Sequence, residues 1–201
     1  MKTKLLITAL TSLAATALFA AEPTVGNAAP DFSLPDATGK THSLADFKGK
    51  FVVLEWFNEG CPFVKKHYGS GNMQKLQQEY SGKDVVWLTI NSSAPGEQGH
   101  LTPETAPKTI SELKMTSTKL LLDPDGKVGR LYGAKNTPHM FVINKEGKLI
   151  YQGAIDSKPT ASASDIASSS NYVKVALDES MAGKPVSTAN TKPYGCSVKY
   201  K

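Results

Sequence analysis

The chain contains two cysteines, Cys61 and Cys196, which lie in very different surroundings. Cys61 follows the apolar run FVVLEWF (51–57) and precedes Pro62, a residue type favoured in the first turn of a helix. A thiol at a helix start faces free backbone N–H groups and the positive end of the helix dipole, which stabilise the thiolate. We therefore predict Cys61 as a nucleophile and Cys196, in the sequence KPYGCSVKY, as its partner thiol.

Two reactions suit such a pair of thiols. The Cys61 thiolate could attack a peroxide oxygen to give a sulfenic acid, or a disulfide sulfur to give a mixed disulfide, and Cys196 could then resolve either product. The 13 residues from Gly183 to Cys196 could span roughly 43 Å if extended at about 3.3 Å each, so Cys196 can reach across a domain of this size or into a neighbouring subunit. A permanent structural disulfide between the two cysteines is the alternative.

Glu55 lies six residues before Cys61, within the apolar run. A carboxylate in a buried strand costs free energy unless it is paired or protonated, and a raised pKa would let it transfer protons for the thiol. We predict that Glu55 is an auxiliary acid or base; a strand residue turned to solvent is the alternative. Asn58, beside the thiol, could hydrogen-bond an oxidised sulfur or cap the helix.

A second functional class is a carrier of Cu(I), because thiolate, thioether and imidazole ligands suit this ion. His67, His139 and Met140 would join the two cysteines as ligands. The chain has no Cys-x-x-x-Cys, however, and a lone histidine is more often structural, so we predict no metal site and no cofactor. Lys65 and Lys66 could supply positive charge to the thiolate, but solvated surface lysines are the simpler interpretation. A third class is a non-catalytic binding module with an inert Cys61.

The first 21 residues have the pattern of a signal peptide. Lys2 and Lys4 precede an uncharged stretch, residues 5–21, which is rich in Leu, Ala and Thr and ends before Glu22. We predict cleavage near Ala20 or Ala21, a periplasmic or secreted protein and no stable membrane insertion after cleavage; a retained anchor is the alternative. Export would place both cysteines in an oxidising compartment.

The charge pattern excludes one class of partner. Loss of the two leader lysines lowers the formal net charge from +5 to +3, and the remaining lysines are scattered. No basic run is interleaved with aromatic residues, so nucleic acid is not a predicted partner. The predicted organisation is a leader at 1–21, one domain at 22–183 and a tail at 184–201 that contains Cys196.

The elements that position Cys61 follow a strand and helix alternation. The apolar runs 51–57 and 84–90 are typical of strands buried on both faces of a parallel sheet, and a helix between them implies a right-handed crossover. The break at 69–71 predicts two helices, with the second capped by Asn72. A further helix is expected to open at Thr102.

The second half of the chain predicts a short strand at 119–123, a short helix, and an antiparallel hairpin that turns at 144–147. Residues 156–170, rich in Ser and Ala, predict a solvated loop. Asn171 is expected to cap a final helix, which Gly183 ends. A turn signal at 36–39 predicts an entry hairpin near the start of the domain.

This order of elements, with a thiol after the first strand of the sheet and Thr137-Pro138 before a later one, resembles the thioredoxin superfamily. Four segments are similar to exported bacterial redoxins, peroxiredoxin-like proteins of the alkyl hydroperoxide reductase and thiol-specific antioxidant type: WFNEGCPFVKKHYGSGNMQKLQ, VVWLTINSSAPG, LLLDPDGKVGRLYGAKNTPHMFVI and KPYGCSVKY. The resemblance covers about residues 24–201.

The resemblance implies an α/β thioredoxin-like fold, in which helices flank a central mixed sheet, with an N-terminal hairpin and an extended C-terminal tail. It implies that Pro138 is cis and lies opposite Cys61, in a substrate groove that includes Thr137, Pro62 and Asn58. The implied activity is that of a thiol peroxidase or thiol-disulfide oxidoreductase, which acts on a peroxide or disulfide and is recharged by an external thiol reductant.

The sequence departs from the family pattern at three places that bear on the implied activity. Val64 stands where thioredoxins have the second cysteine of Cys-x-x-Cys. Leu54 and Asn58 stand where peroxiredoxins have Pro and Thr or Ser before the reactive cysteine. The single arginine, Arg130, is not at the position expected after the Thr-Pro strand. The local dithiol is therefore absent, and Cys196 is the one candidate for a second thiol.

Overall fold

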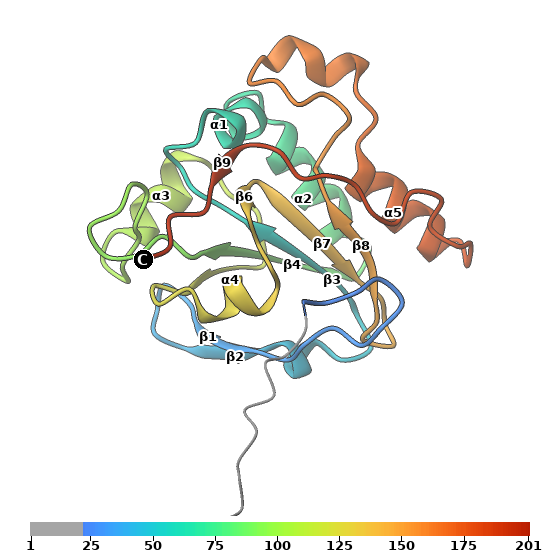
Figure 1. The fold of residues 1–201 in the computed structure, drawn as a ribbon, viewed down its shortest axis with the longest axis horizontal. Coiled ribbons are helices and arrows are strands. Elements are labelled where there is room, and N and C mark those ends of the chain that lie inside the picture. The colour runs from blue at the N-terminus through green and yellow to red at the C-terminus, as the bar shows by residue number, and fades with distance from the viewer. Residues whose placement is uncertain (1–21) are drawn as a thin grey trace, which may run out of the picture.

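A five-stranded mixed sheet forms the centre of the computed structural model, which describes residues 22–201 (Figure 1). The predicted signal peptide lies outside the described residues. Strand order is β5-β4-β3-β7-β8, with β3, β4 and β5 parallel and β7 and β8 antiparallel to their neighbours. The strands are β3 (Phe51–Trp56), β4 (Val85–Asn91), β5 (Lys119–Leu122), β7 (His139–Ile143) and β8 (Leu149–Gly153).

Both faces of this sheet are covered, which explains the unbroken apolar runs in its central strands. One face packs against α1 (Pro62–Gly69), α2 (Asn72–Ser81), α3 (Ala106–Glu112) and α5 (Tyr172–Met181). The other packs against α4 (Lys127–Leu131) and the hairpin of β1 (Ser33–Pro35) and β2 (Thr41–Ser43). All six residues of β3 are buried. Each large apolar side chain buried there contributes about 1.5–3 kcal/mol.

The alternation of side chains along β3 decides what faces the helices. Val53 and Glu55 point to the α1 and α2 side, whereas Val52, Leu54 and Trp56 point to the hairpin side. Glu55 is therefore directed into the same layer of core as Cys61.

Two predicted helix starts are wrong. The helix expected to open at Thr102 begins at Ala106, with Pro107 in its first turn, where the missing N–H costs no helical hydrogen bond. The N-cap of α2 is Gly71, at φ 75°, and not Asn72; a left-handed backbone favours glycine. The Asn72 side chain instead bonds to His67 Nδ1 at 2.8 Å.

The expected loop at 156–170 is only partly solvated. It contains a short 3-10 helix, η2 (Ala163–Ser168), and it begins at Asp156, which is 2% exposed. The prediction for the final helix is confirmed, because the Asn171 side chain accepts a hydrogen bond from the Lys174 N–H at 2.9 Å. No helix among residues 22–201 is long and apolar enough to cross a membrane.

The C-terminal tail, residues 184–201, runs from α5 across the sheet edge toward α1 (Figure 1). Within it, β9 (Cys196–Ser197) pairs antiparallel with β6 (Asn136–Thr137), and Thr137 lies opposite Cys196. This pairing brings the two cysteine segments together.

Candidate active site

Cys61 occupies the N-cap position of α1, as the sequence predicts. Its backbone is extended (φ −76°, ψ 124°), Pro62 fills the first turn, and its carbonyl accepts the Lys65 N–H at 2.9 Å. The side chain is 0% exposed, and the thiol donates to the Thr137 carbonyl at 3.0 Å. The thiol thus lies between the start of a helix and the segment that precedes Pro138.

The Thr137-Pro138 peptide bond is cis, which confirms the expectation from the resemblance. Thr137 contacts both cysteine segments, because its carbonyl accepts the Cys61 thiol and its backbone pairs with Cys196. Cys61 and Cys196 are both free thiols, the first buried and the second half-buried. Residues far apart in the chain are therefore assembled into one two-thiol site.

The two thiols differ in acidity. Burial raises the pKa of Cys61, but hydrogen bonding from the Cys196 thiol, from the backbone N–H groups of Cys196 and Val64 and from the Thr137 side chain outweighs burial, so this pKa lies below its usual range. Burial and the hydrogen bond to Cys61 raise the pKa of Cys196 to about 11. Cys61 is consequently the thiol that ionises first, as a nucleophile requires.

Glu55 is fully buried, so the alternative of a solvent-facing strand residue is wrong. Its carboxylate accepts from Trp87 Nε1 at 2.8 Å, Tyr68 OH at 2.9 Å, Gln77 Nε2 at 3.2 Å and Thr89 Oγ1 at 3.3 Å. Burial outweighs these donors and raises the pKa of Glu55 to about 7. Cys61 is not among the four donors, and the acid or base role of Glu55 stays a prediction.

Asn58 and Pro62 shape the loop and helix start around the thiol. Asn58 Oδ1 accepts the Gly60 N–H at 2.8 Å, and its amide donates to the Gln98 carbonyl at 2.9 Å. The Asn58 carbonyl accepts the Cys61 N–H at 3.1 Å. Asn58 thus fixes the turn that leads into Cys61, while its place in a substrate groove stays a prediction.

Lys66 is buried, at 3% exposure, so the interpretation of a solvated surface lysine is wrong for this residue. Its ammonium group donates to Asp156 Oδ2 at 2.9 Å and to the Lys158 carbonyl at 2.8 Å, and lies 3.4 Å from the Tyr194 hydroxyl. The Tyr194 hydroxyl in turn donates to Asp156 Oδ1. No local pattern marks Lys66 as buried, because its partners lie 90 to 128 positions later in the chain.

The histidines proposed as copper ligands have other neighbours. His67 bonds to Asn72 through Nδ1, and its Nε2 lies 3.8 Å from Asp156 Oδ2. His139 Nδ1 accepts the Lys135 N–H at 3.3 Å, and its ring packs on Phe141 with centroids 4.5 Å apart. Among residues 22–201, no group of three or more His, Cys, Asp or Glu side chains is arranged to hold a metal ion.

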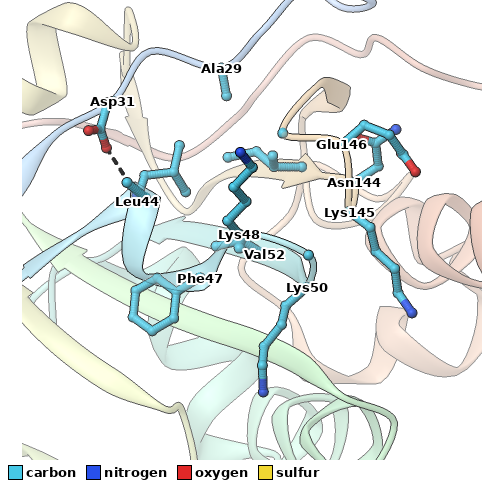
Figure 2. Close-up of a pocket in the computed structure, with 14 residues that line it drawn as sticks. Ala29, Asp31, Leu44, Phe47, Lys48, Lys50, Val52, Asn144, Lys145 and Glu146 are labelled. Atoms are coloured by element: carbon cyan, nitrogen blue, oxygen red, sulfur yellow. Dashed lines mark hydrogen bonds between the residues drawn. The ribbon is translucent and has the colours of Figure 1, made fainter.

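A separate pocket lies at the opposite end of the central sheet (Figure 2). Phe47 and Val52 form part of its apolar lining, and Lys48 and Lys145 lie at its rim. Val52 is near the beginning of β3, whereas Cys61 follows the end of that strand. None of the predicted site residues lines this pocket.

Comparisons with known proteins identify a family and a relative. The family model described as "AhpC/TSA family" matches residues 25–152. The chain is 30% identical over 154 residues to the thiol-disulfide oxidoreductase ResA of Geobacillus thermodenitrificans, covering 74% of this chain and 83% of that protein.

Two solved structures are similar in fold. An uncharacterized conserved protein from Geobacillus kaustophilus has a TM-score of 0.75 at 28% identity, covering 89% of this chain and 93% of that one. The thioredoxin domain of a thiol-disulfide oxidoreductase from Bacteroides vulgatus has a TM-score of 0.52 at 23% identity, covering 64% and 87%. The predicted α/β thioredoxin-like fold is confirmed.

Proposed function

Because the chain belongs to the AhpC/TSA family, we propose that it is a thiol oxidoreductase in which Cys61 is the nucleophile and Cys196 the resolving thiol of the same chain. One observation supports these roles most directly: β9, which contains Cys196, pairs with Thr137, the residue whose carbonyl accepts the Cys61 thiol. The relative named ResA, a thiol-disulfide oxidoreductase, supports the general activity.

With a peroxide, the Cys61 thiolate attacks one oxygen, the O–O bond breaks, and the departing alkoxide or hydroxide takes up a proton. Cys61 becomes a sulfenic acid. The Cys196 sulfur then attacks the Cys61 sulfur, the S–O bond breaks, and water leaves with the Cys196 proton, which gives a Cys61–Cys196 disulfide. With a disulfide substrate, Cys61 forms a mixed disulfide and Cys196 displaces the second substrate thiolate.

An external thiol reductant restores both thiols by exchange at the Cys61–Cys196 disulfide. Glu55, with its pKa raised to about 7, can hold or release a proton near neutral pH, and we propose it as an auxiliary acid or base of this cycle. We further propose that the protein is exported, as the sequence of residues 1–21 suggests.

The test uses the reduced protein, one equivalent of hydrogen peroxide, and intact mass with peptide mapping. The wild type should lose the mass of two hydrogens and yield a peptide that joins Cys61 to Cys196. Cys196→Ser should gain one oxygen on Cys61, and Cys61→Ser should show neither change. Repeated cycles with dithiothreitol separate a catalytic disulfide from a permanent one, because only the catalytic pair consumes several equivalents of peroxide. Absence of both the cross-link and the Cys61 sulfenic acid would overturn the peroxide reaction.

A further inference from the structure

The resolving step proposed above requires Cys196 to lie close to Cys61 when Cys61 is oxidised. A tail that moved freely would present its thiol at a low effective concentration, because the rate of an intramolecular step depends on how well its reactants are held in place. A buried cluster contacts this tail two residues before Cys196, at Tyr194.

Lys66 and Asp156 form the base of this cluster. Their side chains are 0% and 1% exposed, and Nζ lies 2.9 Å from Oδ2. Burial raises the pKa of Asp156, but hydrogen bonds from Tyr194 and Lys66 outweigh burial and keep it below its usual range. A buried ion pair contributes little net stability, because desolvation of both charges offsets their attraction. Its retention beneath the tail therefore suggests a role beyond stability.

Tyr194 connects the ion pair to the thiol site. Its hydroxyl donates to Asp156, its ring faces the Lys66 ammonium group at 5.6 Å, and it meets the Phe63 ring edge-on with centroids 5.7 Å apart. Phe63 lies two residues after Cys61, and Tyr194 lies two residues before Cys196. The contact between Phe63 and Tyr194 therefore joins the two cysteine segments directly, and Asp156 links Tyr194 to Lys66 of α1 through two hydrogen bonds.

The next residue, Gly195, has close contacts that leave its backbone little room to move. Gly195 has φ 121°, and a Cβ there would lie 2.1 Å from the Thr137 carbonyl oxygen. The Asn136 side chain donates to the Gly195 carbonyl at 2.9 Å. The backbone between Tyr194 and Cys196 is therefore packed directly against the β6 segment, and a single residue separates Tyr194 from Cys196.

We propose that Lys66, Asp156 and Tyr194 form a clasp that positions Cys196 for its attack on oxidised Cys61, and so decides whether Cys61 forms a disulfide or is oxidised further. This inference rests on the proposed function. The clasp residues are positioning residues, because none of them touches the reacting sulfurs. When the clasp is loosened, the Cys61 sulfenic acid persists, and a second peroxide transfers one oxygen to it, giving a sulfinic acid and water or alcohol.

The test variant is Tyr194→Phe, which removes only the hydroxyl and keeps the ring against Phe63. Tyr80→Phe is the matched control, because the Tyr80 hydroxyl also donates to a carboxylate, Asp178 Oδ1 at 2.6 Å, but between α2 and α5, away from the tail. Wild type and both variants react with one and then ten equivalents of hydrogen peroxide and are quenched at intervals for mass analysis.

Tyr194→Phe should form the Cys61–Cys196 disulfide about tenfold more slowly and accumulate Cys61 sulfinic acid, because the lost hydrogen bond is to a charged group. The rate at which Cys61 first consumes peroxide should stay within about twofold of wild type, since the clasp acts only on the second step. Tyr80→Phe should match the wild type in both steps. Disulfide formation at the wild-type rate in Tyr194→Phe would overturn the clasp.

A second measurement does not depend on peroxide. In mixtures of reduced and oxidised glutathione, one glutathione disulfide is reduced to two thiols as Cys61 and Cys196 are oxidised to a disulfide. The equilibrium constant for this exchange should fall about tenfold in Tyr194→Phe and stay unchanged in Tyr80→Phe. If peroxide oxidises none of the proteins but the constant falls as stated, the peroxide reaction fails and the clasp stands. An unchanged constant in Tyr194→Phe would refute the clasp by itself.

Discussion

Glu55 should make the folded protein less stable as pH rises through the acid to neutral range. In the fold, burial raises its pKa from 4.5 to about 7. The unfolded chain therefore loses this proton at lower pH than the folded chain does. The stabilising contribution of protonated Glu55 is complete below about pH 4.5 and is lost as pH rises to about 7. At about 1.4 kcal/mol for each pKa unit, the loss amounts to about 3 kcal/mol.

The perturbation that isolates this effect is Glu55→Gln, which has no proton to lose. The glutamine carbonyl can accept the three donors that now reach Oε2, from Gln77, Trp87 and Thr89, and its amide can donate to the Tyr68 hydroxyl. The substitution is therefore compatible with the site, and pH effects from all other groups are common to both proteins.

The assay is urea unfolding of both proteins at pH 4, 6 and 8, in the presence of a thiol reductant, with the free energy of unfolding extrapolated to water. The stability of the wild type relative to Glu55→Gln should fall by about 3 kcal/mol between pH 4 and pH 8, mostly between about 4.5 and 7. A relative stability that is the same at all three values would refute the reasoning. It would mean that the four donors offset burial, so that the pKa of Glu55 is the same in the folded and unfolded chains.

Three further predictions concern the thiols and the fold. Cys196→Ala should raise the pKa of Cys61, because the hydrogen bonding from the Cys196 thiol that lowers this pKa is lost. The pH dependence of alkylation at Cys61 by iodoacetamide measures the pKa, and an unchanged midpoint would contradict the prediction. Gly195→Val should slow formation of the Cys61–Cys196 disulfide, because a Cβ would lie 2.1 Å from the Thr137 carbonyl oxygen. Quenched mass analysis measures this rate, and a wild-type rate would show that the backbone around residue 195 can accommodate the side chain. Asn171→Ala should lower the free energy of unfolding by about 1 kcal/mol through loss of the α5 cap, as urea unfolding would show; no change would mean that the cap contributes little.

The parts of the fold that could be predicted are those determined by local pattern. The runs 51–57 and 84–90 predict β3 and β4 because strands covered on both faces are apolar throughout. Cys61 and Asn171 mark helix starts through the chemistry of their own residue types and neighbours. Apolar runs and capping residues are each defined by a few consecutive residues, so they can be recognised in a single sequence.

The remainder depends on contacts between distant parts of the chain. Lys66 resembles a surface lysine until Asp156 and Tyr194 are brought to it. The distance from Cys61 to Cys196 is set by the pairing of Thr137 with the tail, which no spacing in the sequence reveals. The start of α3 at Ala106 could not be separated from Thr102, because both positions have capping residues and a nearby proline.

The register between β3 and β7 has a consequence for how the family's sequences can vary. Trp56 pairs with His139, so Cys61 lies five residues beyond one member of the pair and Thr137 two residues before the other. Insertion of one residue between 57 and 60 would leave the sheet unchanged but would displace Cys61 and the start of α1 together from Thr137, whose carbonyl accepts the Cys61 thiol. Loops at the other end of the sheet have no such constraint from the thiols. Length changes should therefore be tolerated at 144–147 and rejected in the short connection that leads from Trp56 to Cys61.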